Sequence, residues 1–163
     1  MRGFLLCLCY IAALGILAFF AGRLLARCPL RWDAFPFRDW AFEQKGNLYR
    51  RLRIHRWHRH VPDMSRIFPR LMPPKRLSHR ISAAQAEVMV RETCVAECVH
   101  ACLMVAGLAC PRLWPGPGGW IVCLVYTLLG NLPFILIQRF NRPKLVMLLE
   151  KCRRAEAARS HRP

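Results

Sequence analysis

The hydrophobic residues of this chain fall into long uninterrupted runs. The first run, Gly3 to Gly22, carries no charge and has the length that a helix needs to cross a hydrocarbon core of roughly 30 Å. It predicts a first membrane span over residues 3–22. A cleaved signal peptide is the alternative, because Arg2 supplies a minimal positive start. Against that alternative, the run is long for a signal peptide and Arg23 follows it at once.

Two further apolar runs predict helices in the second half of the chain. A helix begins after Ser82 and turns apolar until Cys110, where Pro111 is expected to end it, with a span over residues 94–110. The third span covers residues 120–138. Proline and glycine dominate the segment between these spans and predict a tight hairpin. The predicted fold class is therefore an all-α integral membrane protein with about three transmembrane helices.

Positive charge lies outside the apolar runs. The chain has 26 Lys and Arg against 9 Asp and Glu, a net charge of +17. These residues gather in a basic loop, residues 23–91, and in a basic tail, residues 139–163. The positive-inside rule places loop and C-terminus in the cytoplasm and the N-terminus outside, within one membrane domain, residues 1–163. Membrane lipids with anionic headgroups are the expected partners, rather than nucleic acid.

Part of the basic loop has the composition of a helix. The stretch FEQKGNLYRRLRIHRW, residues 42–57, contains helix-forming residues, but its apolar side chains point in two directions. An interfacial helix anchored by Tyr49 and Trp57 and an irregular basic segment lying on the membrane both remain open.

Cysteine and histidine do not predict a metal site. Most of the nine cysteines lie inside apolar runs, which favours packing over metal binding. The run HRWHRH supplies His55, His58 and His60 without an acidic partner, as is typical of a solvated basic patch. We expect no metal and no bound cofactor.

Ionisable residues on the second predicted helix are the first candidates for chemistry. Thr93, Glu97 and His100 follow one another at spacings of four and three residues, on one helical face. His100 can act as a general base oriented by Glu97, because imidazole titrates near neutral pH. Glu92 is a second carboxylate if the helix frays. The alternative is structural: Glu97 and His100 pair with each other or with an arginine and hold the helices together.

Polar residues also interrupt the end of the third predicted span. In the predicted topology they lie at the same membrane face as Glu97 and His100, so the two segments predict one interfacial pocket. An ordinary positive flank is the alternative for the arginines. The set comprises Asn131, Gln138, Arg139, Asn141 and Arg142.

Four stretches together resemble a known family. They are FEQKG (42–46), Trp57, ETCVAECVH (92–100) and NLPFILIQRFNRPKL (131–145). On these residues the chain is similar to the glycosyl-4,4'-diaponeurosporenoate acyltransferases of staphyloxanthin-type carotenoid biosynthesis. The resemblance implies transfer of a fatty acyl group onto a sugar hydroxyl of a glycosylated carotenoid or similar glycolipid, in a bacterial inner membrane.

From the shared motifs we infer roles for the candidate residues. An acyl donor such as acyl-CoA would be held by the basic loop and by Arg139 and Arg142, while His100 with Glu97 would activate the hydroxyl of a lipid-linked sugar. Trp57 and the polar residues around the arginines would complete the substrate-binding set. The alternative function is a non-enzymatic membrane scaffold or subunit that binds anionic lipid or a partner through its basic loop, with the polar motifs serving helix packing.

Overall fold

The computed structural model describes residues 1–58, 61 and 81–160, and every regular element among them is helical. Three stretches, Arg2–Leu25, Ala83–Leu113 and Pro117–Ser160, are long and apolar enough to cross a membrane. The predicted all-α class is confirmed. The elements are α1 (Arg2–Leu25), η1 (Ala41–Gly46), α2 (Asn47–Arg51), α3 (Ile54–Trp57), α5 (Ala83–Gly107), α6 (Cys110–Leu113), α7 (Pro117–Val125), the π-helix η3 (Tyr126–Asn131) and α8 (Leu132–Ser160).

Parts of the predicted basic segments lie outside the described residues. These parts are residues 59–60 and 62–80 of the loop, which include His60, and residues 161–163 of the tail.

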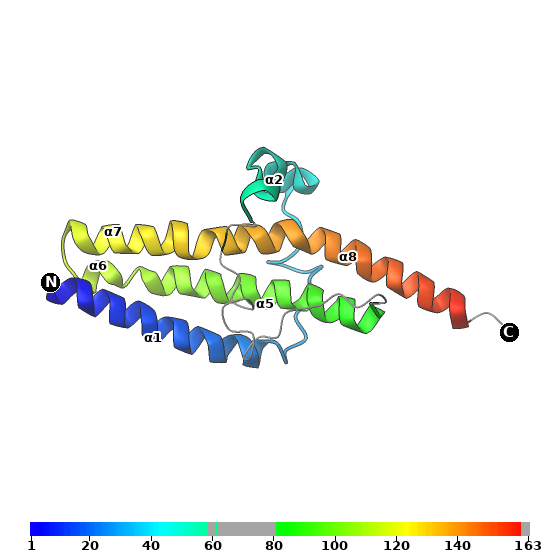
Figure 1. The fold of residues 1–163 in the computed structure, drawn as a ribbon, viewed down its shortest axis with the longest axis horizontal. Coiled ribbons are helices and arrows are strands. Elements are labelled where there is room, and N and C mark those ends of the chain that lie inside the picture. Colours follow the sequence, from blue (N-terminus) through cyan, green and yellow to red (C-terminus); the bar gives the residue numbers. More distant parts are fainter. Residues whose placement is uncertain (59–60, 62–80, 161–163) are drawn as a thin grey trace.

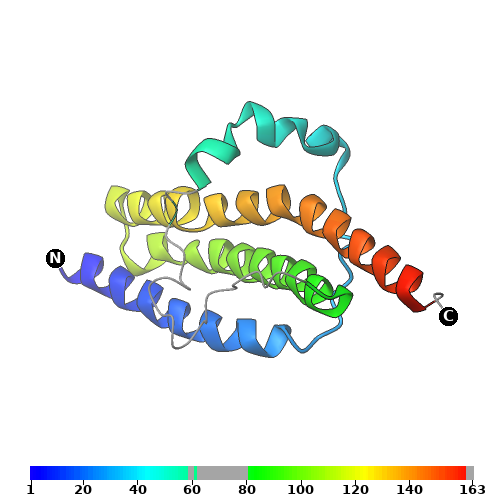
Figure 2. The same ribbon diagram turned by 45° about the vertical axis from the view of Figure 1, so that its right-hand side comes forward.

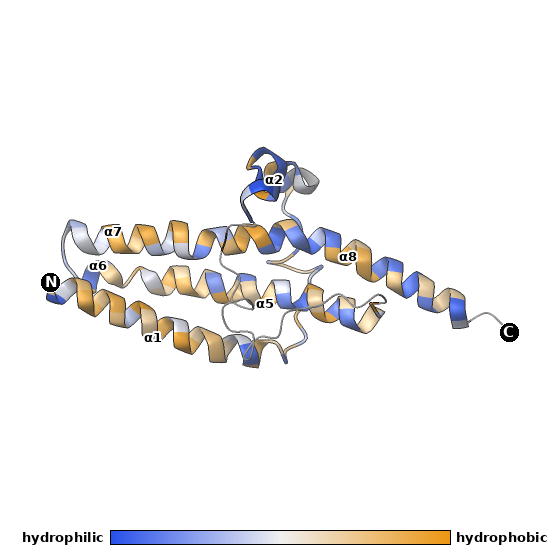
Figure 3. Cartoon of the chain, viewed as in Figure 1, coloured by the Kyte–Doolittle hydropathy of each residue, from blue (hydrophilic) through white to orange (hydrophobic). Residues whose placement is uncertain are grey.

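The long helices lie side by side with α5 in the middle. Figures 1 and 2 show α1 on one side of α5 and the α7–α8 stretch on the other, both running opposite to α5. The most extensive contact joins α5 to α8. Hydrophobic residues cover α1 and α7, whereas hydrophilic ones mark α2 and the outer half of α8 (Figure 3). This segregation is what a helix bundle in a bilayer requires, because lipid contacts its outer faces.

Local sequence explains where α5 begins and ends. Ser82 accepts a hydrogen bond from the Gln85 backbone N–H, and the Gln85 side chain accepts one from the Ser82 N–H, so a capping box confirms the predicted start. The predicted end at Pro111 is wrong: α5 ends at Gly107, and Pro111 lies in the first turn of α6. A first-turn proline loses no helical hydrogen bond, so it can start a helix as readily as stop one.

The basic tail is helical, which the sequence analysis missed. Helix α8 continues from Leu132 to Ser160, well past the predicted span end at Gln138. Its outer half is rich in alanine, arginine, lysine and glutamate, which are strong helix formers. The Pro117–Ser160 stretch of 44 residues is therefore about 66 Å long, twice what a bilayer core needs.

The loop segment before residue 58 forms three short helical pieces, η1, α2 and α3. Gly46, with φ of 94°, ends η1 just before α2 begins, and Arg53, with φ of 50°, lies between α2 and α3. The segment is thus neither one interfacial helix nor irregular. Tyr49 and Ile54 are buried, and Tyr49 and His58 place their rings near Phe140 of α8.

Two apolar clusters hold the ends of the bundle. Ala83, Ala86 and Val90 of α5 pack with Leu149 of α8 at one end. At the other end, three elements contribute one buried cysteine each, Cys7, Cys110 and Cys123, and the Cys7 thiol donates to the Cys110 carbonyl oxygen at 3.6 Å. These three cysteines pack as small hydrophobic residues, as predicted.

Two contacts fix the register between α1 and α5. The Tyr10 hydroxyl donates to the carbonyl oxygen of Ala106 at 3.0 Å. At the other end of the pair, a Cβ added to Gly22 would lie 3.6 Å from Cγ2 of Val99. The uncharged run of α1 therefore ends level with Val99, one residue before His100.

Gly119 supplies a stability test of the hairpin. A Cβ at this position would lie 2.2 Å from the carbonyl oxygen of Trp114 and 2.9 Å from that of Cys110, both backbone atoms. We expect Gly119→Ala to lower the free energy of unfolding in mixed micelles by roughly 1–3 kcal/mol through overpacking. Gly15→Ala is the matched control, because nothing lies within 4 Å of the added Cβ. Equal stability of the two variants would contradict the packing described.

Candidate functional site

Glu97 of α5 lies at the centre of a buried ionic network. One carboxylate oxygen accepts from Arg139 and the other from Arg142, both on α8. Glu97 is 8% exposed and Arg142 is 4% exposed. Two arginines three residues apart lie on one face of α8, so a single carboxylate on α5 can bind both. The paired segments predicted from the sequence thus meet.

Arg142 joins α5, α8 and the loop. Its Nε donates to the Thr93 hydroxyl at 2.9 Å, one terminal nitrogen donates to the Phe37 carbonyl oxygen at 2.7 Å, and the other to the Thr93 carbonyl oxygen at 3.3 Å and to Glu97. Its guanidinium also lies 5.4 Å from the centre of the Phe37 ring. These four hydrogen bonds nearly exhaust the five N–H donors of a guanidinium.

Arg139 binds the loop more extensively. It donates to the carbonyl oxygens of Pro36 at 3.1 Å and Arg38 at 3.0 Å, and it forms ion pairs with Glu97 and with Glu43 of η1. The Trp40 ring lies 5.7 Å from its guanidinium carbon. Arg139 thereby holds the segment from residue 36 to residue 43 against the helix pair.

Glu43 is the second carboxylate of the network. It is 2% exposed and accepts from the Tyr49 hydroxyl at 2.8 Å and from the backbone N–H of Trp40 at 3.1 Å, in addition to Arg139. Burial by itself would raise the pKa of Glu43, but the hydrogen bonds from Arg139, Tyr49 and the Trp40 N–H outweigh it and lower the pKa. Burial and the bond to Glu43 raise the pKa of Tyr49, so its phenol stays a donor.

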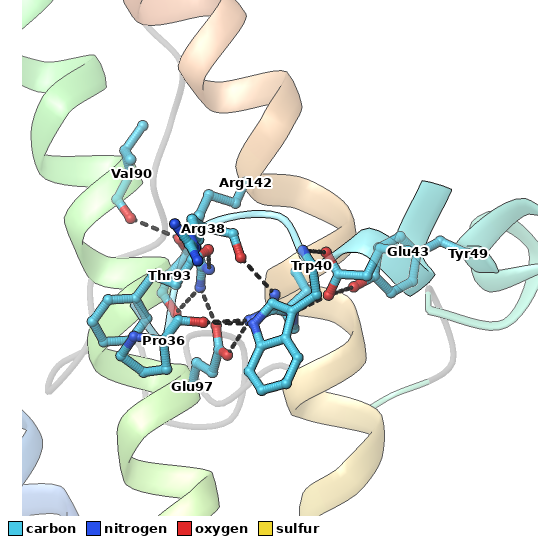
Figure 4. Close-up of polar contacts among 11 residues, drawn as sticks. Pro36, Arg38, Trp40, Glu43, Tyr49, Val90, Thr93, Glu97 and Arg142 are labelled. Carbon is cyan, nitrogen blue, oxygen red and sulfur yellow. Dashed lines mark hydrogen bonds and ion pairs between the residues drawn. The ribbon is translucent and has the colours of Figure 1, made fainter. Parts of the chain in front are cut away.

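The network is electrically balanced. Two glutamates face two arginines, and Figure 4 shows these contacts between α5, α8 and the loop. Removing such charges from water is costly unless each is paired and hydrogen-bonded, as here. The arrangement therefore locks three segments that are distant in sequence into one geometry.

A second polar contact joins α5 to the η3–α8 stretch at His100, one turn along α5 from Glu97. Its Nδ1 is 2.9 Å from the side-chain oxygen of Asn131, and its ring stacks on Phe134 with centroids 4.6 Å apart and planes at 6°. The Asn131 amide nitrogen donates to the carbonyl oxygen of Tyr126 at 2.9 Å, within the π-helix η3. A π-helical turn leaves backbone carbonyl groups without their usual helical hydrogen bonds, and such turns recur at functional sites.

This chain of contacts determines the tautomer of His100. The Tyr126 carbonyl can only accept, so the Asn131 amide must direct its nitrogen there and its oxygen toward the imidazole. His100 Nδ1 must then donate, which leaves Nε2 unprotonated in the neutral ring. An imidazole whose Nδ1–H is held by an acceptor presents Nε2 as a base, the arrangement that proton abstraction requires.

Comparison with known proteins identifies the family. A family model described as glycosyl-4,4'-diaponeurosporenoate acyltransferase matches residues 33–151. The chain belongs to this family. The glycosyl-4,4'-diaponeurosporenoate acyltransferase of Staphylococcus haemolyticus (strain JCSC1435) is 28% identical over 131 residues, 76% of this chain and 72% of that protein. The protein of the same name from Staphylococcus aureus (strain USA300) is 25% identical over 122 residues, 72% of this chain and 70% of that one.

No solved structure matches the chain. The family model spans the loop from residue 33, α5 and most of α8, so it covers both the ionic network and the His100 contact. Family and relatives are named for acyl transfer, which makes this chain an acyltransferase by membership.

Of the two pairings that the sequence left open for Glu97, the one with an arginine forms and the one with His100 does not. Both Glu97 oxygens bind arginines, and the Nδ1 of His100 meets Asn131 instead. Glu92 is not close enough to replace Glu97: α5 is continuous there, and eight residues separate Glu92 from His100, about 12 Å along the axis. An arginine outcompetes an imidazole for a carboxylate because its charge is permanent and its donors form a fork.

The other predicted substrate-binding residues take no part in the hydrogen bonds of the network. Gln138 and Asn141 are half-buried and make no side-chain hydrogen bond with another described residue. Trp57 donates its indole N–H to the Leu52 carbonyl oxygen at 3.0 Å within its own segment. Their roles in substrate binding stay predictions.

Sequence reasoning overlooked Glu43 and Tyr49 as members of the site. A signal was present, because Glu43 is the lone acidic residue in the basic stretch from residue 42 to residue 57. An isolated acid among many bases indicates a specific partner.

Glu97 allows a test of the network. We expect Glu97→Gln to lower the free energy of unfolding by roughly 3–5 kcal/mol, because it leaves two buried arginines facing one carboxylate. Glu87→Gln, on the same helix, is the control: its ion pair with Arg153 is about half exposed and should contribute under about 1 kcal/mol. Chemical unfolding in mixed micelles measures both. Equal losses would show that the buried network does not stabilise the fold.

The pairing of Glu43 predicts that the stability of the fold depends on pH. Its pKa is lowered in the folded state, so the unfolded chain takes up the proton first as the pH falls. Its pairing therefore stabilises the fold above the ordinary glutamate pKa, and this contribution is lost as the pH falls through the lower folded-state pKa. Glu43→Gln should flatten the acid side of the stability profile, whereas Glu150→Gln, an exposed glutamate on α8, should leave its slope unchanged. An unaltered slope in Glu43→Gln would refute the assignment.

Proposed function

We propose that this chain moves a fatty acyl group from an acyl thioester, such as acyl-CoA, onto a sugar hydroxyl of a glycosylated carotenoid or similar glycolipid. The names of the relatives support the reaction class. The observation that carries the proposal is His100, whose Nδ1 is held by Asn131 so that Nε2 is free to take a proton.

The register of the helices supports an interfacial reaction. His100 follows Val99, which lies level with the end of the uncharged run of α1. In the proposed topology the loop and the C-terminus face the cytoplasm and the N-terminus lies outside, so His100 lies at the boundary between hydrocarbon and headgroups. A glycolipid places its sugar at this depth while its apolar part stays in the bilayer.

The reaction transfers the acyl group directly from sulfur to oxygen. The sugar hydroxyl oxygen forms a bond to the thioester carbonyl carbon while Nε2 of His100 takes the hydroxyl proton. The carbon–sulfur bond then breaks, the electron pair stays on sulfur, and the proton passes from Nε2 to the departing thiolate. His100 ends as it began, and the products are an ester and a free thiol.

Arginines of the loop, rather than those of α8, are suited to bind the negative charge of the acyl donor. Arg139 and Arg142 already make four hydrogen bonds each inside the protein, so they have little capacity left for phosphates. The exposed arginines of the α2–α3 segment are better suited to the phosphates of an acyl-CoA. They are Arg50, Arg51, Arg53 and Arg56.

A non-enzymatic scaffold is the competing function, and one observation favours it. The polar network is satisfied almost entirely by groups of the chain itself, which is what helix packing alone would require. The two functions differ at His100: a scaffold needs its packing against Phe134, whereas an enzyme needs the unprotonated Nε2.

Lipid mass spectrometry of producing cells separates the two. Cells that supply the glycolipid acceptor and express the intact chain should gain a glycolipid of added acyl mass. We expect His100→Gln to lower its rate of formation by roughly 10²–10⁴-fold, the usual contribution of a general base. Glu150→Gln is the control, since Glu150 is exposed on α8 and pairs with Arg154 rather than with a residue of the site. Equal product from His100→Gln at matched membrane levels would remove His100 as the base, and no acylated lipid in any strain would favour the scaffold.

A further inference from the structure

An open hollow adjoins the ionic network on the loop side. It is lined by residue 35 and by the four consecutive residues 38–41, and its volume is about 580 Å³. The residues are Phe35, Arg38, Asp39, Trp40 and Ala41. None of them belongs to the residues predicted from the sequence.

We propose that this hollow holds the sugar ring of the glycolipid acceptor. The identity of the acceptor rests on the proposed function. The hollow would be a recognition site for the sugar ring, separate from the residues that carry out the acyl transfer. Two kinds of side chain, aromatic and charged, carry the inference.

Aromatic rings form the apolar part of the hollow. Phe35 and Trp40 lie with ring centroids 6.0 Å apart and planes at 35°, and they are 75% and 42% exposed. The indole N–H of Trp40 donates to the Pro36 carbonyl oxygen at 2.9 Å, so the ring is fixed in place. A rigid, exposed aromatic face is a surface on which the C–H face of a sugar ring can stack while the sugar hydroxyls point outward.

Charged side chains supply the polar part. Arg38 and Asp39 are exposed, and neither side chain makes a hydrogen bond or ion pair with another described residue. A carboxylate and a guanidinium beside an aromatic face can bind neighbouring hydroxyls by charge-assisted hydrogen bonds.

The network fixes the hollow relative to the helices. Arg139 binds the carbonyl oxygens of Pro36 and Arg38 and lies against the Trp40 ring, so the hollow cannot drift from α8. Arg139 also shares Glu97 with Arg142, and Glu97 is one turn from His100 on α5. A sugar in the hollow is thereby kept beside the helix pair that carries the base.

Kinetics with matched variants test the hollow. We expect Phe35→Leu and Asp39→Asn each to raise the KM for the glycolipid acceptor roughly tenfold, as the loss of a stacking face or a charge-assisted hydrogen bond predicts, while the KM for the acyl donor stays constant. Phe42→Leu is the control: Phe42 is 60% exposed and contacts Trp40 at 5.5 Å, but it does not line the hollow. If the aromatic residues only anchor the loop in lipid, Phe35→Leu and Phe42→Leu will behave alike, which would overturn the proposal.

A binding measurement separates failure of the hollow from failure of the proposed reaction. Saturation-transfer NMR of the full chain in nanodiscs, with methyl glucoside and methyl galactoside as probes and glycerol as the non-sugar control, should detect contact with at least one glycoside that Asp39→Asn abolishes. Sugar contact without acyl transfer in cells would keep the hollow and reject the reaction. Acyl transfer without sugar contact, or contact unchanged in Asp39→Asn, would reject the hollow.

Discussion

The structure depends on one carboxylate that binds two arginines. Glu97 of α5 accepts from Arg139 and Arg142 of α8, and through them it holds the loop from Pro36 to Glu43. The ions are buried, so each is costly unless its partners stay in place. The helix bundle thereby acquires a geometrically defined polar centre. The remaining features of the site, including the orientation of Trp40 and Tyr49, follow from this arrangement.

The same helix pair that carries the ions also carries the candidate base. His100 is one turn from Glu97, yet it is separated chemically, because Glu97 is saturated by arginines and Asn131 takes the imidazole Nδ1. Had Glu97 bound His100, the carboxylate would have favoured the charged imidazolium. A neutral amide instead fixes the tautomer without adding charge. The π-helix η3 contributes the Tyr126 carbonyl that orients Asn131.

The sequence predicted the helices better than the contacts between them. Uncharged runs and the Ser82 cap located the long helices, because lipid imposes length and polarity on any span. The helical tail was missed because a span prediction ends where charge begins, although the backbone continues as helix. Partner choice at Glu97 was not predictable from spacing alone, since His100 and two arginines compete for it. Glu43 reaches the site because the loop lies against α8, and no periodicity in the sequence predicts the path of a loop.

Nitrogen NMR of the histidine side chains is the most direct test of the central claim, that Asn131 holds His100 with Nε2 unprotonated at the edge of the apolar layer. The full chain, labelled at histidine and inserted in nanodiscs, is compared with His100→Gln so that the signals of His100 can be assigned. A protonated Nδ1 with a bare Nε2 at neutral pH is the predicted result. A protonated Nε2, or a doubly protonated ring, would contradict the proposed base.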